Sequence, residues 1–248
     1  MTDDAGNRGR PLVVDRATWQ AERDRLLVRE KAHTQEGDAI AAARRRLPMV
    51  EVDATIPVTG KNGPVPLLDV FEGRRQLIAY YYMWHPGKPA PDQCEGCTFF
   101  NGQVGELSYL HSRDVTFATF CEGSYEESAP YHAFMGWEMP WYSTQGSTDA
   151  LLAGRWFGML VCYLREGDRV CETYWATGRA TEVMAPSYGL LDMTVYGRQE
   201  TWEDSPDGWP RPLATTGEQF RRDGRPTAQW ARVAAGRSDH LGPAGVSA

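Results

Sequence analysis

Four hydrophobic stretches in the middle of the chain have the length of β-strands. Residues 76–84 and 115–121 are mainly apolar and aromatic, which is typical of strands that are covered on both faces of a sheet. Residues 159–164 and 169–176 form two further strand-like runs, and a turn signal around Gly167 joins them. The pattern therefore predicts two buried strands followed by a β-hairpin.

Segments with helical spacing of apolar residues separate these strands. Helices are predicted from about residue 98 to 110, from 126 to 137, and within 181–190. Strand–helix–strand units connected in this way form a right-handed parallel core. An appended hairpin and last helix give the element order of a thioredoxin fold. We therefore expect an α/β protein with a thioredoxin-like domain over residues 49–202, then an irregular arm and mobile tail over 203–248.

The N-terminal part of the chain predicts a helical extension. Asp15 can cap a first helix, a glycine-containing break is expected at residues 34–38, and a second short helix would end at Pro48. Residues 49–57 then alternate between apolar and polar side chains, as a strand would. We therefore assign residues 1–48 to an extension that precedes the thioredoxin-like domain.

Composition and charge exclude several classes of protein. The chain has 248 residues and a formal net charge of −7, whereas a dedicated nucleic-acid binder usually carries a basic domain. No apolar run approaches the roughly 20 residues that span a bilayer. Residues 1–10 are polar and lack the apolar region of a secretory signal. We therefore expect a cytoplasmic protein that binds neither nucleic acids nor membranes.

One pair of the five cysteines has close spacing, Cys94 and Cys97. In a reducing compartment such a pair is more often redox-active or metal-binding than structural. The pair lies between the first buried strand and the next helix, whose N-terminus presents unpaired N–H groups that stabilise a thiolate. Cys94 is therefore the predicted nucleophile of a thiol–disulfide oxidoreductase, and Cys97, one turn into the helix, would resolve the mixed disulfide.

The same pair has two other interpretations, a metal site and inert thiols. A structural zinc site needs four ligands, and no second CxxC is present. Copper remains an alternative because thiolates select Cu(I). Cys94 and Cys97, with His85 or Cys121, could hold it in a Cu(I) chaperone or a copper-dependent oxidoreductase. The thiol–disulfide interpretation requires no cofactor.

Four residues are predicted to line a substrate cleft beside the cysteines. Trp84 and His85 end the first buried run, Glu95 follows the nucleophile, and Trp141 lies in a short strand over residues 140–143. The alternative for the two tryptophans is the core, and for His85 a structural hydrogen bond in the loop. An acid beside the thiolate should destabilise it, so Glu95 predicts a couple more reducing than the about −120 mV of strongly oxidising disulfide donors.

The remaining cysteines carry weaker signals. Cys121 ends the second buried strand at the same sheet edge as the CxxC pair, either as an inert buried thiol or as a third sulfur of the site. Cys162 and Cys171 would face each other, and could form a disulfide, in only one of two turn registers of the hairpin. In the other register Cys162 would pair with Thr173.

Several short stretches occur in a characteristic order along the chain. They are Glu30-Lys31, Arg44-Arg45-Arg46-Leu47-Pro48-Met49, Cys94-Glu95-Gly96-Cys97-Thr98, Ser112-Arg113-Asp114-Val115-Thr116, Met135-Gly136-Trp137, Pro140-Trp141, Leu190-Leu191-Asp192-Met193-Thr194 and Gly197-Arg198. Over about residues 11–212 the chain thereby resembles a bacterial thioredoxin-like family of unassigned function. Members of that family are often labelled predicted dithiol–disulfide oxidoreductases. The resemblance implies a thioredoxin-like fold.

The chain also departs from thioredoxin proper. Gln93 and Gly96 occupy the positions where thioredoxins have Trp and Pro, and residues 156–158 before the third core strand contain no proline. The disulfide substrate and the reductant stay unknown at this point. A third hypothesis is a non-catalytic binding module, in which the N-terminal extension and the arm with Trp202 and Trp209 wrap the domain or join a homodimer.

Overall fold

The computed structural model describes residues 9–210 and 220–241 of the chain. Residues 9–48 and 190–210 form one unit, and residues 49–189 and 220–241 form the other. Within the described residues, no helix combines the length and the apolar composition needed to cross a membrane.

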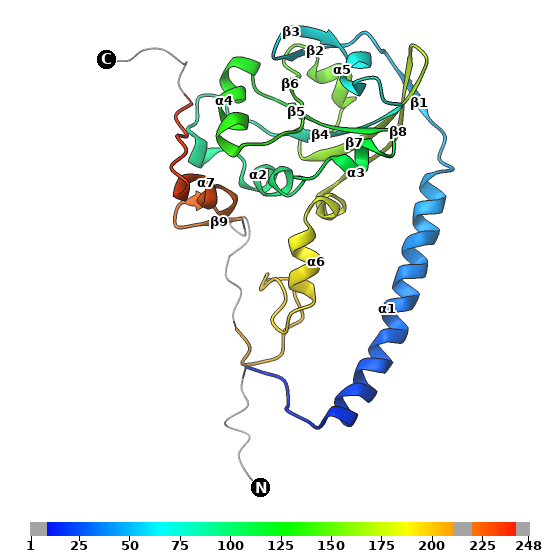
Figure 1. Cartoon of the computed structure of the whole chain (residues 1–248), viewed down its shortest axis with the longest axis vertical. Coiled ribbons are helices and arrows are strands. Elements are labelled where there is room, and N and C mark those ends of the chain that lie inside the picture. Colours follow the sequence, from blue (N-terminus) through cyan, green and yellow to red (C-terminus); the bar gives the residue numbers. More distant parts are fainter. Residues whose placement is uncertain (1–8, 211–219, 242–248) are drawn as a thin grey trace. The chain divides into compact units, whose positions relative to one another are not determined.

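The larger unit contains, among its described residues, a mixed sheet of eight strands. The strand order is β1-β8-β7-β4-β5-β6-β2-β3 (Figure 1). The strands are β1 (Val50–Val52), β2 (Pro57–Gly60), β3 (Gly63–Pro66), β4 (Gln76–Tyr82), β5 (Val115–Cys121), β6 (Trp141–Ser143), β7 (Met159–Glu166) and β8 (Arg169–Thr177). The four strands predicted in the middle of the chain are therefore confirmed.

The four central strands have the thioredoxin arrangement. β4 and β5 are parallel, whereas β7 pairs antiparallel with both β4 and β8. Helices α2 (Glu95–Gly102) and α3 (Ser108–His111) connect β4 to β5, and helices α4 (Tyr125–Met135) and α5 (Thr148–Leu152) lie between β5 and β7 in the chain. The order β8-β7-β4-β5 confirms the predicted α/β, thioredoxin-like fold class.

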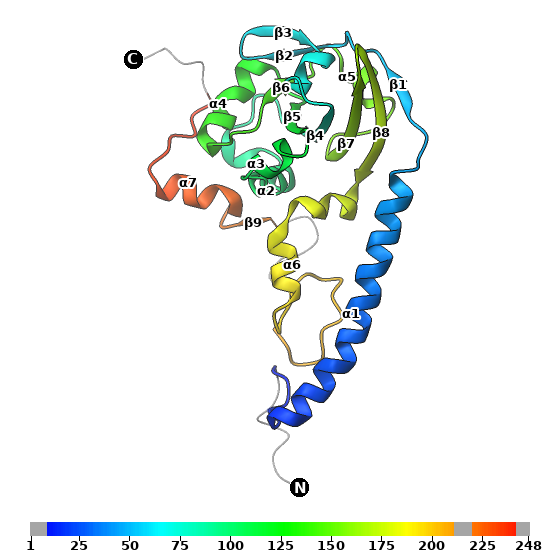
Figure 2. The same cartoon turned by 45° about the vertical axis from the view of Figure 1, so that its right-hand side comes forward.

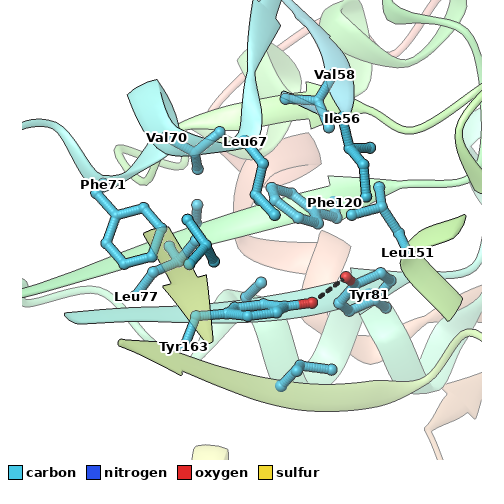
Figure 3. Packing of buried hydrophobic residues seen from close by; sticks show 14 of the residues in the cluster. Ile56, Val58, Leu67, Val70, Phe71, Leu77, Tyr81, Phe120, Leu151 and Tyr163 are labelled. Carbon is cyan, nitrogen blue, oxygen red and sulfur yellow. Dashed lines mark hydrogen bonds between the residues drawn. The ribbon is translucent and has the colours of Figure 1, made fainter. Parts of the chain in front are cut away.

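Both faces of the sheet are covered, which explains why its central strands are mainly apolar and aromatic. On one face Leu77 and Tyr81 of β4 join a hydrophobic cluster with residues of η2 (Leu67–Phe71) and α5. In this cluster the hydroxyl oxygens of Tyr81 and Tyr163 lie 2.6 Å apart, so the two buried groups satisfy each other (Figure 3). On the other face Tyr80 and Tyr82 pack with α2 and α4, and Figures 1 and 2 show α2 opposite α5 across the sheet.

Two predicted boundaries in the N-terminal part are wrong. Helix α1 (Arg16–Arg44) is continuous, without the break expected at residues 34–38, although Asp15 does cap it. A glycine inside a helix costs only about 1 kcal/mol, which is too little to end a helix with several turns on both sides. The strand expected over residues 49–57 is divided, because the Asp53 carboxylate accepts the backbone N–H of Thr55 at 2.8 Å and turns the chain before β2.

The β7–β8 hairpin has the second predicted register near its turn, because Glu166 pairs with Arg169 and residues 167 and 168 form the turn. A bulge between Cys162 and Tyr163 then shifts the pairing by one residue. Cys162 consequently lies opposite Tyr174 rather than Thr173, and Cys171 lies opposite Leu164. The cross-strand disulfide considered for Cys162 and Cys171 is therefore wrong, and none of the five cysteines forms a disulfide.

Part of the predicted irregular arm has regular structure. β9 (Arg221–Arg222) and β10 (Arg225–Pro226) form a hairpin, followed by η5 (Thr227–Gln229) and α7 (Trp230–Ala234) (Figure 2). Of these elements, β10 and η5 pack against α2. The other short helical elements are η3 (Ala90–Asp92), η4 (Gly178–Met184) and α6 (Pro186–Asp192). The mobile tail predicted for the end of the chain lies, from residue 242 on, outside the described residues.

Candidate active site

The CxxC pair lies at the N-terminus of α2, directly after the loop that follows β4. Cys94 is the N-cap residue, and its Sγ accepts the backbone N–H of Cys97 at 3.4 Å. The Cys94 side chain is half-buried, and Cys97 is 4% exposed. The two sulfurs therefore differ in their access to solvent, and a cysteine takes the position that Ser or Asp commonly occupies at a helix start.

The two thiols also differ in acidity. The hydrogen bond from the Cys97 side chain, the Cys97 backbone N–H and nearby His85 lower the pKa of Cys94 from its ordinary 9.0 to about 7, against the opposing effects of burial and Glu95. The hydrogen bond to Cys94, burial and the charge of Cys94 raise the pKa of Cys97 well above its ordinary value. Cys94 is therefore the first thiol of the pair to ionise, near neutral pH, while Cys97 keeps its proton.

The buried Cys97 thiol contacts the end of β4. The Cys97 Sγ accepts the backbone N–H of Met83 at 3.4 Å, and the side chain of buried Tyr80 also forms a hydrogen bond with Cys97. These contacts hold the Cys97 sulfur against the end of β4. They also give a thiolate formed at Cys97 two donors, which favours the ionisation of this thiol.

A network of buried hydroxyls anchors the start of α2. The Thr98 hydroxyl donates to the carbonyl of Cys94 at 2.8 Å and lies 2.7 Å from the hydroxyl of Tyr82 and 2.9 Å from that of Tyr131. Since a hydroxyl has one donor and two lone pairs, both tyrosines donate to Thr98. The Tyr131 hydroxyl accepts the Gln229 side-chain amide at 2.6 Å, so every donor direction is fixed.

The loop before the pair is held by its own side chains. Gln93 is fully buried, and its amide oxygen accepts the His85 backbone N–H at 3.0 Å while its amide nitrogen donates to the carbonyls of His85 and Lys88. The His85 Nδ1 lies 2.8 Å from the Asp92 carbonyl oxygen. His85 thus makes a loop hydrogen bond and also lies near enough to Cys94 to lower the pKa of its thiol.

The tryptophans predicted to line a cleft belong to the core. Trp84 is 2% exposed and packs against Tyr131 and against Gly123, where an added Cβ would lie 2.2 Å from the Trp84 ring. Trp141 is 5% exposed, stacks on Trp137 and donates its indole N–H to the Ser128 hydroxyl at 2.9 Å. The cleft assignment of Trp84 and Trp141 is therefore wrong, because the helices pack over both rings.

The residues proposed for copper do not form one site. Cys121 is fully buried, its thiol contacts Ser128 and the Gly123 backbone, and burial raises its pKa to about 12. Across residues 9–210 and 220–241, no three His, Cys, Asp or Glu side chains are grouped as metal ligands. Cys94 and Cys97 thus have no third donor in His85 or Cys121, and the described residues do not fit the copper site.

The sequence pattern does not identify three residues of the site. Arg221 lies beside Glu95, with 3.6 Å between guanidinium Nη2 and carboxylate Oε2, Phe220 packs on Gly96, and Gln229 joins the hydroxyl network. All three come from the segment predicted as an irregular arm. No local pattern identifies them, because more than a hundred residues separate them from the cysteines.

A family described as "Bacterial protein of unknown function (DUF899)" matches residues 8–232. The chain belongs to this family. The match extends over the two units and includes both the CxxC pair and Arg221. No curated protein matches the chain. The family description assigns no activity, so the chemistry of this member follows from its own site.

Solved structures with distant likeness to this family member include three proteins with redox or thioredoxin-like names. A putative thiol:disulfide interchange protein DsbE from Chlorobium tepidum is 15% identical, with a TM-score of 0.36, and the match covers 56% of this chain and 98% of the other. Peroxiredoxin Q from Xanthomonas campestris is 14% identical, with a TM-score of 0.38 and coverages of 58% and 98%. A thioredoxin-like protein from Aeropyrum pernix is 14% identical, with a TM-score of 0.35 and coverages of 63% and 99%. The strand order, not these likenesses, carries the fold assignment.

Proposed function

We propose that this protein is a thiol–disulfide oxidoreductase in which Cys94 attacks a disulfide and Cys97 resolves the mixed disulfide. The observation that carries the proposal is the asymmetry of the pair. Cys94 is half-buried at a helix N-terminus with a pKa of about 7, whereas Cys97 is buried and keeps its proton. A thiolate with a pKa near the ambient pH is the most effective attacking group in disulfide exchange.

The first step is attack by the Cys94 thiolate on one sulfur of a substrate disulfide. The substrate S–S bond breaks, a mixed disulfide with Cys94 forms, and the departing substrate thiolate takes a proton from solvent. The negative charge of Cys94 is then gone. Because that charge is one cause of the raised pKa of Cys97, the second thiol becomes easier to deprotonate at this moment.

In the second step Cys97 loses its proton to solvent and its thiolate attacks the Cys94 Sγ. The mixed disulfide breaks, the second substrate thiolate leaves and takes a proton from solvent, and a Cys94–Cys97 disulfide remains. Two electrons have passed from the cysteine pair to the substrate, and the protons have been exchanged with solvent. A dithiol reductant then restores the pair, and no cofactor is required.

The experiment is turnover of insulin or a small disulfide with dithiothreitol as the reductant. We expect activity above the uncatalysed rate, loss of activity in Cys94→Ser, and accumulation of a mixed disulfide on Cys94 in Cys97→Ser. Cys121→Ser is the matched control, because this buried thiol lies outside the pair and should leave turnover unchanged. Wild-type turnover at background level, or equal turnover in Cys94→Ser, would reject the proposal.

A further inference from the structure

An arginine from the C-terminal hairpin contacts the segment that leads into the CxxC pair. The Arg221 guanidinium donates to the carbonyl of Pro91 at 2.6 Å. It also lies 3.7 Å from the carboxylate of Asp92 and 3.6 Å from that of Glu95. One cation therefore faces the two carboxylates on either side of Cys94.

Contacts on both sides of Arg221 hold the β9–β10 hairpin against the site. The Phe220 ring lies 4.8 Å from that of Phe99, and an added Cβ at Gly96 would meet it at 3.4 Å. On the other side of the hairpin, fully buried Gln229 donates to the carbonyl of Ala90 at 2.8 Å and to the hydroxyl of Tyr131. These anchors lie before and after Arg221 in the chain.

The arginine side chain is itself held in one orientation. Its Nη1 donates to the carbonyl of Gly224 in the hairpin turn at 2.9 Å, while Nη2 reaches Pro91 and Glu95. The side chains of Arg221 and Glu95 are only 23% and 24% exposed, so solvent screens their interaction less than it would screen a surface pair.

We propose that the β9–β10 hairpin completes the dithiol site, with Arg221 as a positioning residue that opposes the carboxylates of Asp92 and Glu95 beside the Cys94 sulfur. This inference rests on the proposed function and adds the regulation of its nucleophile. Arg221 acts through Glu95, whose charge disfavours the Cys94 thiolate. Removal of Arg221 leaves that charge unopposed, so the thiolate becomes less favoured and the couple more reducing.

The test compares Arg221→Gln with Arg222→Gln. Both substitutions remove one positive charge from β9, but Arg222 is exposed, and among the described residues no ion pair is found for it. The readout is the pH dependence of Cys94 alkylation by iodoacetamide, with the modified peptide identified by mass. We expect Arg221→Gln to move the midpoint upward and to slow alkylation at pH 6 about two- to five-fold, while Arg222→Gln matches the wild type.

Glu95→Gln provides a second arm that does not depend on the folding of Arg221→Gln. It should move the midpoint downward, and the Glu95→Gln, Arg221→Gln double variant should return toward the wild-type midpoint. Equal midpoints for Arg221→Gln and Arg222→Gln, or an unchanged midpoint in Glu95→Gln, would overturn the inference. These midpoints are independent of turnover, so the failure of the proposed function would be seen separately as wild-type turnover at background level.

Discussion

The hydrogen bond between the two thiols is the first cause of the low pKa of Cys94, and it can be removed with one substitution. Cys97→Ala deletes the donor, whereas Cys97→Ser replaces it with a hydroxyl that can still donate. The backbone N–H of residue 97 and the electrostatic effect of His85 on Cys94 remain in both variants. We therefore expect the pKa of Cys94 to rise above about 7 in Cys97→Ala, without reaching the ordinary 9.0, and to stay lower in Cys97→Ser.

The size of the effect follows from the thiolate fraction. At pH 6 a thiol with a pKa of about 7 is roughly one-tenth ionised, and one with a pKa of 9 is roughly one-thousandth ionised. The thiolate fraction thus falls roughly hundred-fold. The thiolate that remains is more basic and reacts faster, by roughly six- to ten-fold for a Brønsted coefficient of about 0.4–0.5, which offsets part of that loss. Complete removal of the shift would therefore slow attack about ten-fold. Since other causes remain, we expect about three- to ten-fold for Cys97→Ala.

The assay is the initial rate of reaction with a small aromatic disulfide between pH 5 and 9. The modified cysteine is identified by peptide mass, because half-buried Cys162 can also react. Buried Cys121 serves as an internal reference that should stay unmodified. Identical pH midpoints for Cys97→Ala and Cys97→Ser would refute the reasoning, since only the donor at residue 97 distinguishes the two variants.

Three further predictions concern the core beneath the site and the redox couple. Thr98→Val leaves two buried tyrosine hydroxyls without their acceptor, so urea unfolding should show a loss of at least about 2 kcal/mol; a loss below about 0.5 kcal/mol would contradict the network. Gly123→Ala forces a Cβ to 2.2 Å from the Trp84 ring and should lower the free energy of unfolding by about 1–3 kcal/mol, measured by thermal unfolding. Gly105→Ala, whose added Cβ meets open space in the described structure, should leave it unchanged, and equal melting temperatures for the two variants would count against the packing. The reduction potential in a glutathione titration should lie below about −120 mV, because Glu95 disfavours the Cys94 thiolate, and a value that positive would reject this prediction.

The strands and the start of α2 could be predicted from the sequence because their determinants are local. Residues 115–121 are mainly apolar since both faces of β5 are covered, and the predicted strand has the observed bounds. A CxxC pair directly after a buried strand and before a helix predicts a thiol at a helix N-terminus, and Cys94 is the N-cap of α2.

The remaining features depend on tertiary contacts that no local pattern reports. An aromatic side chain such as Trp84 suits a core and a cleft wall equally, and only the helices packed over it decide. The turn residues predict the β7–β8 pairing only as far as Tyr163, because the bulge between Cys162 and Tyr163 shifts the pairing beyond that point by one residue. Arg221 and Gln229 contact the site because a segment more than a hundred residues further along the chain packs against α2 and the loop before it. Such long-range returns are not encoded in residue spacing.

The turn register of the β7–β8 hairpin has a consequence for how this chain responds to oxidants. Because Glu166 pairs with Arg169, Cys171 lies opposite Leu164, and Cys162 lies opposite Tyr174 beyond the bulge, so the two sulfurs do not face each other across the ladder. Cys121 is enclosed in the core. Mild peroxide stress should thus yield one defined internal cross-link, at residues 94 and 97, instead of a scrambled mixture, and the protein could be cycled repeatedly between its two states.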